Sequence, residues 1–158
     1  HLKVAVNISP AQFRARNLAE TVLQNLAAAG LAPNRLELEI TESVMLQDEE
    51  AAFTTLTRLH DLGVRIALDD FGSGYSNLGY LQRFPLDTLK IARPFVLALE
   101  EGDRDAAFVE TIVRLAASLD LRVVAEGIET SGNAAALVLR SAPFDRNAFA
   151  PKFVFAVA

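Results

Sequence analysis

Segments in which apolar and polar residues alternate are separated by segments with apolar residues three or four positions apart. The first pattern is typical of β-strands and the second of amphipathic helices. The alternating pattern predicts strands at residues 2–7, 35–40, 65–69, 88–91 and 122–126. Strands that are joined by helical segments of ten or more residues indicate βαβ units, and therefore a parallel sheet.

Each predicted strand has one apolar face and one face that ends in a polar residue, because strand side chains alternate with a period of two. The apolar faces, which include Val4 and Val6 on the first strand, are expected to pack under helices. In parallel α/β folds, active sites are built at the carboxyl ends of the strands. The polar residues at these ends are Asn7, Glu39, Asp69, Lys90 and Glu126.

The intervals between these polar strand ends are 32, 30, 21 and 36 residues, which fit successive βα units. A complete (β/α)₈ barrel takes about 250 residues, whereas this chain has 158. We therefore predict an α/β fold, a partial TIM-like (β/α)₈ barrel of about five βα units. Residues 1–130 would form the barrel core, and residues 131–158 a divergent C-terminal segment of the same domain.

Composition excludes several kinds of chemistry. The chain has no cysteine and two histidines, so disulfides, Cys-ligated zinc and thiol catalysis are excluded. A net charge of −5 argues against a general nucleic-acid binder. No run approaches the roughly 18 apolar residues of a membrane span. We expect a cytoplasmic protein that binds no DNA and has no membrane segment.

The polar strand ends offer an all-oxygen ligand set, with Lys90 as the cation among them. Hard oxygen ligands favour magnesium, manganese or calcium over zinc. The adjacent Asp69 and Asp70 suit two metal ions and an in-line phosphoryl displacement. Each carboxylate alone would also fit a helix cap or a solvated loop, so the coincidence of all five strand ends carries the prediction. A magnesium enzyme of the enolase type, with a lysine base, is the alternative.

Five segments of the chain have an order and spacing that can be compared with known families. They are Asn7–Ser9, Glu39–Ser43, Asp69–Ser76, Lys90–Ala92 and Ala125–Thr130. These segments resemble the signature motifs of the EAL domain family, the bacterial cyclic di-GMP phosphodiesterases of nucleotide signalling. The resemblance covers residues 2–130. It implies metal-dependent hydrolysis of one phosphodiester of cyclic di-GMP to linear pGpG on a modified (β/α)₈ barrel.

The resemblance also implies a set of metal ligands. Asn7, Glu39 and Asp69 would hold a first ion, and Asp69, Asp70 and Glu126 a second. The implied cofactor is magnesium or manganese. Calcium would compete for the same oxygens and inhibit.

Catalytic and supporting roles follow from the same resemblance. Lys90 would position the attacking water, and Glu126 would act in catalysis as well as in metal binding. Glu42 would anchor the loop after Asp70, and Glu129 would support the site from outside the ligand set. Substrate-binding residues are not assigned.

The chain departs from the family pattern at three places. It opens at His1 almost directly in a strand, without the Glu-Ala-Leu segment, so we expect missing upstream sequence of this domain and sensory or cyclase domains before it. Ala92 stands where an aspartate is usual, on the strand face of Lys90. The resemblance ends after Thr130. Residues 152–157 fit a substitute strand, and a divergent or frame-shifted end fits equally well.

These departures lead us to expect poor or no activity from this chain alone. The alternative function is a non-catalytic module that binds cyclic di-GMP or a protein partner. Ala92 favours that alternative, whereas the Asp69-Asp70 pair and Glu126 oppose it. Missing barrel strands would leave open sheet edges that favour association, so we expect instability or oligomers such as a homodimer.

Overall fold

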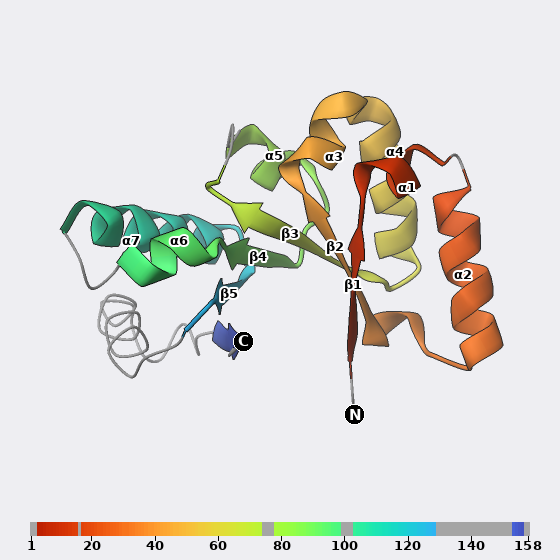
Figure 1. Cartoon of the computed structure of the whole chain (residues 1–158). Coiled ribbons are helices and arrows are strands. Elements are labelled where there is room, and N and C mark those ends of the chain that lie inside the picture. Colours follow the sequence, from red (N-terminus) through yellow and green to blue (C-terminus); the bar gives the residue numbers. More distant parts are fainter. Residues whose placement is uncertain (1–2, 16, 74–77, 99–102, 129–152, 157–158) are drawn as a thin grey trace. The chain divides into compact units, whose positions relative to one another are not determined.

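The computed structural model describes residues 3–15, 17–73, 78–98, 103–128 and 153–156 (Figure 1). The chain divides into two compact units. The first consists of His1–Asp69 and Gly74–Asp87, and the second of Asp70–Ser73 and Thr88–Ala158. Both are α/β, as the alternation of strand and helix patterns predicts.

Three parallel strands organise the first unit. β1 pairs with β2, and β2 with the first part of β3. Its elements in chain order are β1 (Val4–Ile8), α1 (Pro10–Arg14), α2 (Leu18–Ala29), η1 (Pro33–Arg35), β2 (Leu36–Thr41), α3 (Glu42–Gln47), α4 (Glu49–Asp61), β3 (Arg65–Phe71) and α5 (Leu78–Arg83).

The core of the first unit lies between its sheet and α3 and α4. Leu38 and Ile66 contribute from the strands, and Met45 and Leu56 from the helices, all of them fully buried. α4 begins at Glu49, because the Asp48 side chain accepts a hydrogen bond from a backbone amide of its first turn. α2 packs against α4 (Figure 1).

The expected burial of the apolar face of β1 is wrong. Val4 is 44% exposed and Val6 is 40% exposed. The reason lies in the helix packing, because α2 buries Leu18 and Leu26 while it packs against α4, and α1 contacts α2 and α3. An alternating apolar pattern predicts the strand itself, but it does not show that a helix covers it.

The described residues of the second unit also form three parallel strands. β4 (Thr88–Ile91) pairs with β5 (Arg122–Glu126), and β5 pairs with β6 (Phe153–Ala156). β4 and β5 have the bounds that the sequence predicts, and β6 confirms the strand suggested within residues 152–157. α6 (Arg93–Leu97) and α7 (Asp103–Ser118) pack against each other and against β5 (Figure 1).

Several short helices were not predicted. α3 and α6 have six and five residues, which is too short for a helical periodicity to be recognised. α1 and α2 lie between the first two predicted strands. Among the described residues, no helix is both long and apolar enough to cross a membrane.

Candidate functional site

The first unit brings Asn7 and Glu39 side by side. They are register partners in the parallel β1·β2 pair, and Glu39 in turn is opposite Ala67 on β3. Asp69 lies two residues beyond Ala67, so the period of two places it on the same face. Glu39 is buried, Asp69 is half-buried and Asn7 is exposed. The predicted grouping at the carboxyl ends of these strands is therefore present within this unit.

The second unit places Lys90 against Glu126. The Lys90 Nζ lies 2.6 Å from the Glu126 Oε1, with 9% and 33% of the two side chains exposed. Lys90 is the register partner of Val124, and Glu126 stands two residues further along β5, on the same face. A buried ammonium group is costly without a partner, and the Glu126 carboxylate provides one.

Asp70 joins this pair from the last residues of β3. A carboxylate oxygen of Asp70 lies within 4.8 Å of one of Glu126. The backbone of Asp70 has a φ of +54°, in the left-handed region that non-glycine residues adopt rarely. Ser73 closes the turn, because its backbone amide and its hydroxyl both donate to the Asp70 carbonyl oxygen, at 3.2 and 2.8 Å.

The donor set of the second unit fits a hard divalent cation. Metal–oxygen distances of about 2.0 to 2.6 Å allow two oxygens on one ion to lie roughly 4 to 5 Å apart. The Asp70 and Glu126 oxygens lie close to that range. Two carboxylates at this separation repel each other unless a cation is near, and Lys90 is the side chain that provides a positive charge beside Glu126.

The predictions from the sequence also concern Glu42, Ala92 and Glu129. Glu42 is the buried first residue of α3, where a carboxylate also favours the positive end of the helix. Ala92 is 1% exposed and is the N-cap of α6, without a side chain that could cap it. Glu129 lies outside the described residues.

Sequence reasoning gave no role to two residues of α6 that lie beneath this site. A Cβ added at Gly72 would lie 2.8 Å from Cε2 of Phe95, and one added at Gly127 would lie 2.8 Å from Cδ of Arg93. Glycine directly after a strand is a sequence signal for a tight turn. Phe95 and Arg93 carry no such signal, because Phe95 is far from Gly72 along the chain and Arg93 is far from Gly127.

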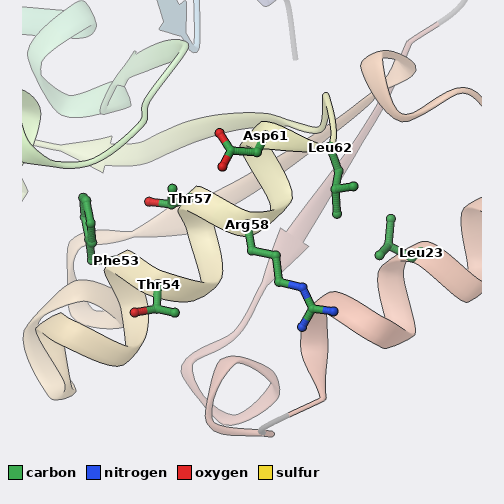
Figure 2. A pocket seen from close by; sticks show the side chains of 7 residues that line it. All are labelled: Leu23, Phe53, Thr54, Thr57, Arg58, Asp61 and Leu62. Atoms are coloured by element: carbon green, nitrogen blue, oxygen red, sulfur yellow. The ribbon is translucent and has the colours of Figure 1, made fainter.

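The pocket in Figure 2 lies elsewhere in the first unit. It has a volume of about 590 Å³ and is lined by residues of α2 and α4 together with Leu62. Arg58 extends from α4 toward α2, where it pairs with Glu20 (Figure 2). The predicted site residues do not line this pocket, so it is separate from the candidate site.

Comparison with known proteins adds a family assignment. A model of the EAL domain family, described as "EAL domain", matches residues 1–144. The curated cyclic di-GMP phosphodiesterase NbdA of Pseudomonas aeruginosa is 43% identical over 129 residues, which are 82% of this chain and 16% of NbdA. The chain spans about a fifth of the length of the curated relatives that it matches.

Solved structures give the same result. A MucR phosphodiesterase in complex with cyclic di-GMP is 42% identical, with a TM-score of 0.82 over 87% of this chain and 56% of that one. BlrP1 of Klebsiella pneumoniae is 30% identical, with a TM-score of 0.80 over 89% of this chain and 36% of that one. Its complexes contain cyclic di-GMP with calcium or with manganese. These matches confirm the predicted fold class of a partial (β/α)₈ barrel.

Proposed function

Because this chain belongs to the EAL domain family, we propose that it is part of a phosphodiesterase that hydrolyses cyclic di-GMP. One water molecule adds across one phosphodiester: its oxygen bonds to phosphorus, one P–O ester bond breaks, and the leaving oxygen takes a proton. The product is linear pGpG. The observation that supports this proposal best is the grouping of Asp70, Glu126 and Lys90 at one end of the second unit.

The proposed cofactor is magnesium or manganese, held by oxygen ligands. The ligands would be Asn7, Glu39 and Asp69 for one ion and Asp69, Asp70 and Glu126 for the other. When bound, such ions neutralise phosphate charge and make a water molecule more acidic. Calcium would occupy the same oxygens and inhibit turnover.

The remaining proposed roles concern the attacking water, the loop after Asp70 and the support of the metal ligands. Lys90 would donate hydrogen bonds to the attacking water, while the charge of Glu126 stabilises its ammonium form. Glu42 would anchor the loop after Asp70, and Glu129 would support the ligands from outside the set. We place the reaction in the cytoplasm, in a longer protein that carries sensory or cyclase domains and forms a homodimer.

The test is a chromatographic time course of cyclic di-GMP with the purified chain and manganese, beside an Asp69→Asn variant. We expect slow formation of linear dinucleotide by the unmutated chain, none by the variant, and suppression by added calcium. Equal product from both samples would contradict the assignment of Asp69. A folded chain that forms no product and binds no manganese would contradict the proposed function.

A non-catalytic binding module is the second candidate, and Ala92 is the observation that favours it. The position is buried beside the strand of Lys90 and offers no carboxylate. Titration of cyclic di-GMP separates the two functions, since a binding module retains affinity without turnover. Ala92→Asp sharpens the test: turnover that rises in this variant supports an impaired enzyme, whereas unchanged binding without turnover supports a module.

A further inference from the structure

Two glycines follow the paired carboxylates of the second unit. Gly72 lies two residues after Asp70, and Gly127 directly follows Glu126. Their φ angles are +97° and +72°, so both positions favour glycine on backbone conformation alone. Both glycines also closely approach α6, which begins just after β4. One short helix therefore contacts both turns that carry the carboxylates.

The turn after Asp70, which contains Gly72, packs against an aromatic pair. A Cβ at Gly72 would lie 2.8 Å from Cε2 of Phe95 and 3.3 Å from Cε1 of Phe108, so the turn has no room to move toward α6. The two rings pack with their centroids 4.7 Å apart, and they join α6 to α7. The hydrogen bonds from Ser73 to the Asp70 carbonyl oxygen then link this contact to the Asp70 backbone.

The turn after Glu126, which contains Gly127, packs against the aliphatic part of the Arg93 side chain. A Cβ at Gly127 would lie 2.8 Å from Cδ of Arg93 and even closer to its Cγ. These atoms belong to the aliphatic part of the side chain, next to the backbone of α6. The helix itself is held in place by Val96, which is fully buried, and by the packing of α6 against β5 and α7.

We propose that α6 is a positioning element that sets the separation of the Asp70 and Glu126 carboxylates through Phe95 and Arg93. Magnesium and manganese favour octahedral oxygen coordination, which magnesium requires in near-ideal form, so a shift of either turn would weaken binding. Groups that orient metal ligands typically change metal affinity by 10- to 100-fold when they are removed. The inference rests on the proposed function for the metal, whereas the geometry of the turns is independent of it.

The test compares three variants of the 158-residue chain. Phe95→Ala removes the ring under Gly72, Phe95→Leu retains part of its volume, and Leu97→Ala truncates an exposed residue of the same helix as the control. Calorimetric titration with manganese measures affinity. Hydrogen exchange of the Ser73 amide measures the Asp70 turn without any metal. We expect Phe95→Ala to weaken manganese binding about tenfold and to speed Ser73 exchange about fivefold or more, with a smaller change for Phe95→Leu.

Arg93 allows a matched test of the second contact. Arg93→Met keeps the aliphatic stem without the charge, whereas Arg93→Ala removes both. We expect Arg93→Met to bind manganese within about twofold of the unmutated chain and Arg93→Ala to bind about tenfold more weakly. Equal losses in the two variants would assign the effect to charge and contradict positioning by the stem.

The outcomes separate this inference from the proposed function. An unmutated chain that binds no manganese contradicts the metal site, and Ser73 exchange in Phe95→Ala then still decides whether α6 holds the turn. If Phe95→Ala unfolds the chain, the comparison of Phe95→Leu with Leu97→Ala decides instead. The positioning role of α6 is wrong if the Phe95 variants and Leu97→Ala change Ser73 exchange to the same extent.

Discussion

The two units hold their acidic strand ends in different ways. In the first unit, Asn7 and Glu39 are neighbours because β1 and β2 pair in a parallel register. In the second unit, Glu126 is held by an ion pair with Lys90, and its turn rests on Arg93. Parallel pairing brings the strand ends together in both units, and Glu126 depends in addition on two side chains, Lys90 and Arg93. The first arrangement should therefore tolerate substitution better than the second.

Breaking the Lys90–Glu126 pair should have the largest effect, because it acts on turnover as well as on stability. Lys90→Met leaves the partly buried Glu126 carboxylate without its cation. Leaving a buried polar group without its partner typically costs about 1 to 3 kcal/mol of unfolding free energy. If Lys90 also orients the water, turnover of cyclic di-GMP should fall about 100-fold or more. Urea denaturation and the chromatographic assay measure the two effects.

The double variant Lys90→Met with Glu126→Gln is the control for that prediction. Removing the second charge as well should restore most of the unfolding free energy, because an uncharged pair has no unpaired carboxylate to desolvate. Activity should stay lost. A double variant that is less stable than Lys90→Met would show that the ion pair does not explain the stability of this end of the unit.

Two glycines, one from each unit, sharpen the comparison further. Gly72 and Gly30 both have positive φ angles, but a Cβ at Gly30 would have no neighbour within 4 Å. Gly30→Ala should cost about 1 kcal/mol, the penalty of the left-handed conformation. Gly72→Ala adds a clash with Phe95 and should cost about 2 to 4 kcal/mol. Chemical denaturation measures both, and equal costs would contradict the close approach at Gly72.

In the first unit, a substitution at Asn7 should lower metal affinity and leave the free energy of unfolding nearly unchanged. Asn7 is exposed, so Asn7→Ala should change the unfolding free energy by less than about 0.5 kcal/mol. If Asn7 is a ligand, manganese affinity should still fall about tenfold. The matched control is Ser9→Ala, which alters the N-cap of α1 and leaves the proposed ligands intact. A variant at Asn7 with unchanged affinity would remove it from the ligand set.

The same contrast explains what the sequence predicts. The bounds of β4 and β5 follow from the alternation of apolar and polar residues along these segments. The neighbouring positions of Asn7 and Glu39 follow from parallel pairing of two strands whose polar residues stand at equivalent ends. These features depend on local pattern and on the general rules of parallel sheets.

Other features could not be predicted, because they depend on tertiary packing. α6 has five residues, so its position beneath Gly72 and Gly127 has no periodic signal. The exposure of Val4 and Val6 depends on which helices cover β1, and an alternating pattern does not contain that information. The left-handed backbone at Asp70 likewise has no sequence signature. Aspartate is common in turns in general, so its presence does not indicate a positive φ.

The smallest expected effect concerns the ion pair of Arg58 with Glu20 in the first unit, the exposed counterpart of Lys90 with Glu126. Its side chains are 53% and 46% exposed. The hydrogen bond from Arg58 holds the pKa of the Glu20 carboxyl below its ordinary value of 4.5. A carboxyl with a lowered pKa in the folded state stabilises the protein above its unfolded pKa, and this contribution is lost as the pH falls through the folded value.

Thermal melts of the unmutated chain and of Arg58→Met, from pH 7 to pH 3, test this contribution. Arg58→Met should melt slightly lower above pH 4.5, and the difference should shrink as the pH falls further. Because the pair is exposed, 1 M salt should reduce the difference at pH 7 as well. The matched variant Glu20→Gln should remove the same pH dependence. A difference that persists unchanged to pH 3 and in high salt would mean that Arg58 stabilises α2 and α4 through its aliphatic stem, as Arg93 is proposed to do beneath Gly127.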